Sequence, residues 1–151
     1  MFKKLFYYKV IYTDFLPLAI YDAQTICVPF VRLALVLIRP KFKYDKALLN
    51  HELTHVIQHF KNPISNVFNY LFNKEYRFKA EAEAYSIQYV TVYDVILESK
   101  IDEYVYLLIK NYKIKDLSGY VKTYLKSLIV KELELKHTTN KYETYANLNI
   151  S

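Results

Sequence analysis

The chain has 151 residues, of which 53% are hydrophobic, and this is long enough for one domain with a substantial core. Its one glycine excludes a glycine-rich phosphate-binding loop, and its one cysteine, Cys27, excludes an internal disulfide and is expected to be a small core residue. The net charge of +6 comes without an arginine cluster, a zinc-finger cysteine set or the aromatic motif of an RNA-binding sheet, so nucleic-acid binding is disfavoured.

The first forty residues predict a small antiparallel-type sheet. Apolar runs at residues 10–12, 18–21, 25–28 and 31–38 are interrupted by aspartate and proline, which is typical of short strands. The longest apolar stretch, residues 28–38, is too short to span a membrane and contains Arg32. Because no transmembrane segment is predicted and no uniform apolar signal core follows the first residues, we expect a cytoplasmic protein.

Helical periodicity dominates the rest of the chain. Helices are expected at residues 45–61, 64–72, 75–93, 101–112 and 120–136, and the polar tail at residues 138–151 is expected to be flexible. Asp45 can cap the first of these helices, and Asn62 followed by Pro63 ends it. The predicted fold class is therefore α+β, with a small N-terminal sheet followed by a helical body.

The first expected helix contains the pattern H-E-x-x-H at residues 51–55. Two histidines four residues apart project from the same face of a helix, so His51 and His55 can converge on one zinc ion. Glu52 can reach a water molecule on that metal and act as its general base. The alternative is that both histidines are ordinary surface or core residues and Glu52 a solvated acid.

A catalytic zinc site of this kind needs a third protein ligand. His59 lies one further helical turn beyond His55, so we expect it to be a satisfied histidine near the helix end. Glu81 and Glu83, on a later helix, are the stronger candidates. Because two residues span about 200° of helical rotation, only one of them can face the metal, and periodicity alone does not decide which.

An H-E-x-x-H helix followed by a helical E-x-x-A resembles the gluzincin class of zinc metallopeptidases, the group that includes thermolysin. The resemblance implies a zincin-like fold, with Glu81 as the third zinc ligand and Ala84 as the small residue that lets two helices approach. Tyr85 stands where the class has an aspartate. Residues 30–90 also resemble small metallopeptidase-like proteins of phages and bacteria, which implies a phage-encoded protein of the host cytoplasm or the virion.

Together these patterns predict one zincin-like domain, residues 1–151, that binds Zn²⁺ through His51, His55 and Glu81. The expected activity is that of a zinc metalloendopeptidase hydrolysing a peptide or protein substrate, with Glu52 as general base. Tyr85 is the expected partner of the oxyanion, and Tyr76, Arg77 and His137 are alternatives. Residues 31–38 are a candidate strand for pairing with an extended substrate, or a simple core strand.

Two other function classes remain open from the sequence. One is a non-enzymatic structural or regulatory module of a phage or bacterium that keeps the metal site for stability. The other is a basic protein that binds nucleic acid or a membrane surface, in which the histidine motif is incidental. The sequence does not determine the substrate or the oligomeric state.

Overall fold

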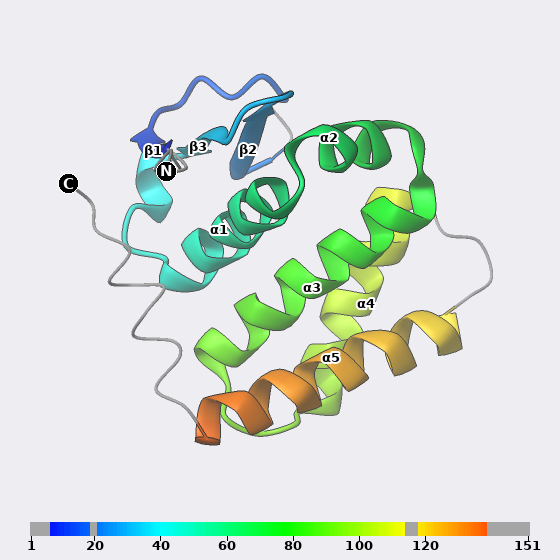
Figure 1. Ribbon diagram of the computed structural model, residues 1–151. Helices are drawn as coiled ribbons and strands as arrows, with labels where there is room; N and C mark the ends of the chain where they lie inside the picture. Colours follow the sequence, from blue (N-terminus) through cyan, green and yellow to red (C-terminus); the bar gives the residue numbers. More distant parts are fainter. Residues whose placement is uncertain (1–6, 19–20, 114–117, 139–151) are drawn as a thin grey trace. The chain divides into compact units, whose positions relative to one another are not determined.

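The computed structural model describes residues 7–18, 21–113 and 118–138, and Figure 1 traces the chain through them. Three strands are followed by a short 3-10 helix and five α-helices in this part of the chain, so the α+β class is confirmed. The chain divides into two compact units, residues 1–77 and 78–151, which are described in turn. The single zincin-like domain stays a prediction, and residues 139–151 of the predicted flexible tail lie outside the described part.

The sheet of the first unit is mixed. It contains β1 (Tyr7–Tyr12), β2 (Ala23–Val28) and β3 (Leu33–Ile38) in the order β1-β3-β2. The predicted antiparallel pairing is correct for β2 with β3 and wrong for β1, which runs parallel to β3. Side chains alternate with a period of two residues in either direction of pairing, so the hydrophobic pattern carries no information on strand direction.

The strand predicted at residues 18–21 is also wrong at the two positions that the structure describes there. The Tyr21 N–H donates to the Leu18 carbonyl over 3.2 Å and closes a turn. Pro17 precedes this turn and has no N–H to donate to a strand ladder, which explains why an apolar run fails to form a strand here. Residues 19 and 20 lie outside the described part.

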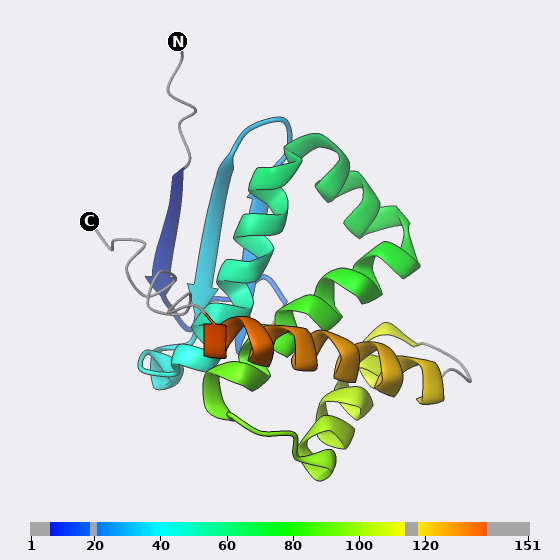
Figure 2. The same cartoon turned by 60° about the horizontal axis from the view of Figure 1, so that its bottom comes forward.

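Helix α1 (Lys46–Lys61) covers one face of the sheet (Figures 1 and 2). Alternate residues of β3 form a buried cluster with one residue of β2 and with apolar residues of α1: Ala23, Ala34, Val36, Ile38, Leu53 and Val56. Each large side chain of such a cluster contributes about 1.5–3 kcal/mol by leaving water. This packing holds α1, which contains His51 and His55, against the sheet.

Local signals set both ends of α1. After the 3-10 helix η1 (Pro40–Phe42), the Asp45 side chain accepts a hydrogen bond from the Leu48 N–H over 2.9 Å and caps the helix, as the sequence predicts. Asn62 ends α1 and caps α2 (Pro63–Phe72), since its side-chain oxygen accepts from the Ser65 N–H. Pro63 takes the first helical position, where no N–H is needed.

Arg77 fixes the corner between α2 and α3 (Lys74–Val92). Its Nε donates to the Tyr70 carbonyl over 2.8 Å, and its Nη2 donates to the Leu71 carbonyl over 2.9 Å. These carbonyls belong to the last turn of α2, where no intrahelical partner exists. The first turn of α3 is thereby attached to the end of α2.

The second unit is helical. It contains the rest of α3 with α4 (Glu98–Tyr112) and α5 (Ser118–Thr138), which bury one shared core: Phe78, Ala82, Tyr89, Val90, Ile101, Val105, Leu108, Val121, Leu125, Ile129 and Leu133. The Tyr89 hydroxyl donates to the Val95 carbonyl and accepts from the Leu97 N–H, which fixes the connection between α3 and α4. Among the described helices, none has the length and apolar character needed to cross a membrane.

Candidate functional site

His51 and His55 lie on one face of α1, as their spacing of four residues predicts. Their ring centroids are 5.1 Å apart, with the ring planes inclined by 76°. His51 is buried and His55 is half-buried. The two imidazoles are therefore close enough to share one metal ion.

Gln58 determines which nitrogen of His55 is available to a metal. The Gln58 side-chain oxygen lies 3.0 Å from Nδ1 of His55, and since a carbonyl oxygen can only accept, Nδ1 carries the proton. Nε2 then carries the lone pair that can bind a metal, and the hydrogen bond orients the ring. Sequence reasoning missed Gln58, although its spacing of three residues from His55 on a helix was a usable signal.

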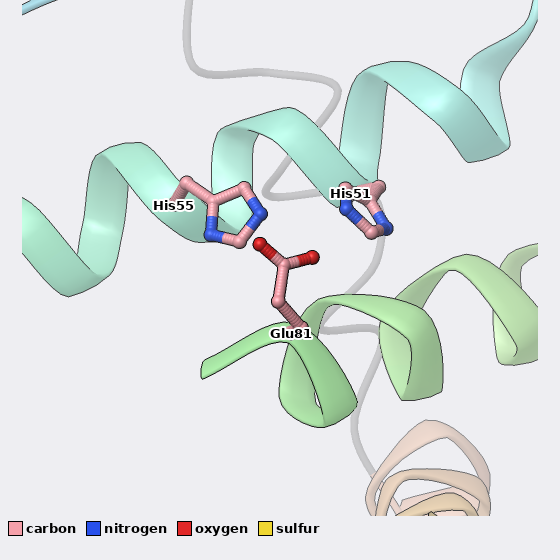
Figure 3. A group of neighbouring side chains, drawn as sticks. All are labelled: His51, His55 and Glu81. Carbon is pink, nitrogen blue, oxygen red and sulfur yellow. The ribbon is translucent and has the colours of Figure 1, made fainter. Parts of the chain in front are cut away.

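Glu81 joins the two histidines. It lies on α3, one turn beyond Arg77, and is buried, as are the small residues Ala80 and Ala82. The ligand atoms of His51, His55 and Glu81 all lie within 4.8 Å of one another, and Figure 3 shows both imidazole rings near the Glu81 carboxylate. Glu83 does not belong to this group.

The donor set and its spacing fit zinc. Two imidazole nitrogens and one carboxylate oxygen are the ligands of many catalytic zinc sites. Tetrahedral bonds of about 2.1 Å separate neighbouring ligand atoms by about 3.4 Å. The widest separation allowed within this group, 4.8 Å, exceeds that spacing by about 1.4 Å.

Glu52 is buried and directed toward β2. The Thr25 hydroxyl lies 2.6 Å from Oε2 of Glu52 and 3.1 Å from its backbone carbonyl. The shorter distance is typical of a hydroxyl that donates to a carboxylate. Thr25 and Glu52 are 27 residues apart, so no local sequence signal could have identified this contact.

Cys27 lies on β2, two residues after Thr25, and packs against the core of the first unit. Burial raises the pKa of its thiol to about 12, and the negative charge of Glu52 adds to the effect. A thiol with this pKa is protonated at neutral pH and is a poor nucleophile. The observation supports the sequence-based expectation that Cys27 is a core residue.

The four candidates for the oxyanion partner have different surroundings. Tyr76 accepts a hydrogen bond from the Asn66 side chain over 2.8 Å, and Arg77 holds the end of α2, so both have structural roles. The Tyr85 ring packs against Tyr104 with the centroids 5.4 Å apart. His137 lies in the last turn of α5. The catalytic role of Tyr85 stays a prediction.

His59 is a structural residue. Its ring is fully buried, and its Nε2 lies 2.8 Å from the Val31 carbonyl, to which it donates. It is not part of the group formed by His51, His55 and Glu81. Its place near the end of the helix is as expected, but the ring is satisfied only at Nε2, since its buried Nδ1 has no hydrogen-bond partner among the described residues.

The substrate strand expected at residues 31–38 is wrong in its position within the sheet. β3 is the central strand and pairs with β1 on one side and with β2 on the other along its whole length, so it cannot accept a further strand. The alternative, a simple core strand, is confirmed. In the described part of the chain the outer edge of β2 is paired with no strand, and β2 is the edge strand that contacts Glu52.

In comparisons with known proteins, the chain matches no protein-family model, no curated protein and no solved structure.

Proposed function

We propose that the chain is a zinc-dependent metallopeptidase in which His51, His55 and Glu81 hold the metal. The observation that carries the proposal is the convergence of these three ligand atoms within 4.8 Å, two from the H-E-x-x-H helix and one from α3. The resemblance of the same residues to the gluzincin pattern agrees with it. Zinc bound by three protein ligands lowers the pKa of a water molecule and polarises a carbonyl.

Glu52 is the general base of the proposed reaction. It accepts the proton of the attacking water and passes it to the leaving amine, so that the peptide bond is cleaved without a covalent intermediate. The Thr25 hydroxyl holds one carboxylate oxygen, which limits the rotation of the side chain. A structural metal site has no need of an oriented carboxylate beside its ligands, and this favours an enzyme over a non-enzymatic module.

An extended peptide would bind along the outer edge of β2. The Arg39 N–H donates to the Asp22 carbonyl over 3.0 Å, so Asp22 and Arg39 are a hydrogen-bonded pair that continues the β2–β3 ladder. Hydrogen-bonded and non-hydrogen-bonded pairs then alternate along the ladder. Residues 23, 25 and 27 then direct their backbone N–H and C=O groups away from β3. A substrate strand that pairs with Thr25 would lie beside the hydroxyl that holds Glu52.

The decisive experiment is elemental analysis of the purified full-length chain after incubation with zinc and removal of excess metal. We expect about one zinc per chain. Glu81→Ala should lower the zinc affinity by more than tenfold, because it removes a ligand. Glu83→Ala is the matched control, with the same substitution two residues along the same helix, and should leave the affinity unchanged.

Glu52→Gln separates metal binding from catalysis. The variant should keep its zinc and lose cleavage of an unfolded protein substrate, since an amide cannot accept the proton. Equal loss of zinc in the Glu81 and Glu83 variants, or no zinc in the parent chain, would overturn the metal site. Full activity in Glu52→Gln would overturn the role of the base alone.

A further inference from the structure

Helix α2 presents four large apolar side chains to solvent and a polar side chain to the interior, while Val67 and Tyr70 are half-buried. Ile64, Phe68, Leu71 and Phe72 recur at helical spacing, and between 47% and 78% of each is exposed. The buried residue of this helix is Asn66, whose side chain donates to the Tyr76 hydroxyl. A helix of a globular protein usually buries its apolar side chains, and a large exposed apolar surface of this kind marks an interaction site.

Phe30, in the turn between β2 and β3, extends this surface. Its ring meets that of Phe68 edge to face, with the centroids 6.2 Å apart, while Phe68 in turn stacks with Phe72 at 6.4 Å. The backbone of Phe30 has a φ of 69°, a conformation that bulky residues rarely adopt. Phe30, Val31, Ile64, Phe68, Leu71 and Phe72 are all exposed and together form what we call the apolar patch.

The two sequence stretches that contribute the apolar patch carry basic residues and no acid, and the first acid after the second stretch is exposed Glu75. No aspartate or glutamate occurs between Asp22 and Asp45 or between Glu52 and Glu75, the two stretches that contribute the patch. Exposed Lys61 is the last residue of α1, two residues before α2, and exposed Lys74 is the first residue of α3, two residues after the end of α2. Residues 1–77 contain eleven lysines and arginines against five acids, so they hold the whole net charge of +6.

We propose that the apolar patch binds the surface of an anionic lipid bilayer, with α2 lying in the plane of the interface. Phenylalanine, leucine and isoleucine on one helix face enter the boundary between head groups and acyl chains, while flanking lysines contact anionic head groups. A second copy of the chain fits less well. Packing two apolar patches together would bring four lysines of the same sign close together, with no acid in either contributing stretch to offset them.

The test is co-sedimentation of the full-length chain with vesicles of phosphatidylcholine plus phosphatidylserine, and with vesicles of phosphatidylcholine alone. Binding is expected to the first kind and to weaken with salt. The double variant Phe68→Ser, Phe72→Ser should lower the partition coefficient at least about tenfold, because two exposed rings no longer leave water. Phe15→Ser is the matched control, because Phe15 is exposed to the same extent as Phe72, 78%, but is not part of the apolar patch.

Charge is tested with Lys61→Gln, Lys74→Gln, which should lower binding to the anionic vesicles about tenfold or more. Circular dichroism checks folding, and zinc content should not change in any of these variants, so the result is separate from that for the metal site. Absence of binding to anionic vesicles would overturn the proposal. So would a dimer in light scattering that the phenylalanine variant dissociates, or binding to duplex DNA that needs the lysines but not the phenylalanines.

Discussion

The hydrogen bond between Thr25 and Glu52 can be tested whether or not a substrate is known. Thr25→Val keeps the shape of the side chain and removes the hydroxyl, which leaves the buried Glu52 carboxylate without this donor. The oxygen atoms are 2.6 Å apart, in the range of hydrogen bonds to charged acceptors, and such bonds contribute about 1.5–3 kcal/mol. We therefore expect Thr25→Val to lower the free energy of unfolding by about 1.5–3 kcal/mol.

A double-mutant cycle isolates the contact from other effects of each substitution. Thr25→Val, Glu52→Met and the double variant are compared by urea unfolding, followed by circular dichroism, with a chelator present so that metal binding does not contribute. Glu52→Met retains most of the side-chain volume and removes both acceptors. The sum of the two single losses in unfolding free energy should exceed the loss in the double variant by about 1.5–3 kcal/mol, and this difference is the coupling energy.

Thr54→Val is the matched control for this cycle. Thr54 is also buried in the first unit, but its hydroxyl donates to the Asn50 carbonyl over 2.8 Å and not to Glu52. Its substitution should therefore destabilise the chain additively with Glu52→Met. A coupling energy between Thr25 and Glu52 below about 0.5 kcal/mol, no larger than that of the control pair, would refute the proposed contact.

Two further predictions concern the neighbours of these residues. Burial, and to a smaller extent the charge of Glu52, raises the pKa of the Cys27 thiol from 9.0 to about 12. Cys27 should therefore react with iodoacetamide at pH 8 about a thousandfold more slowly than an ordinary thiol. Mass spectrometry follows the reaction, a free thiol peptide serves as the control, and reaction at the peptide's rate would contradict the prediction. Gln58→Leu, which removes the acceptor for Nδ1 of His55, should weaken zinc binding about 10–100-fold without removing a ligand. Competition with a chelating dye measures the affinity, and an unchanged affinity would mean that Gln58 does not orient His55.

Sequence reasoning succeeded where the signal is local. The capping of α1 by Asp45 and its end at Asn62 follow from side chains that bond the backbone within three residues. The common face of His51 and His55 follows from helical geometry alone. The helices are found within three residues of their expected bounds, because helical periodicity and capping are properties of short stretches.

The pairing of strands and the choice between two glutamates were decided by tertiary structure. The apolar sequence of β3 is compatible with an edge strand or a central strand, and only the pairing of a strand on each side decides between them. The hydrophobic pattern of β1 is the same for parallel and antiparallel pairing. Glu81 and Glu83 have similar neighbours in the sequence, but only Glu81 shares a group with the histidines. Thr25 and Glu52 are 27 residues apart in the sequence, so the periodicity of a single helix or strand cannot predict their contact.

Helix α2 shows most clearly which properties follow from the sequence and which depend on tertiary contacts. Its sequence determines a helix with one apolar face, because Ile64, Phe68, Leu71 and Phe72 recur every three or four residues after Pro63. The same pattern would suit a helix packed on a core. Which face is buried depends on tertiary partners, and here Asn66 is buried and bonded to Tyr76 while the large apolar side chains are exposed. The sequence determined the periodicity and the charges, whereas tertiary contacts decided the orientation, because burial is a property of the assembled fold.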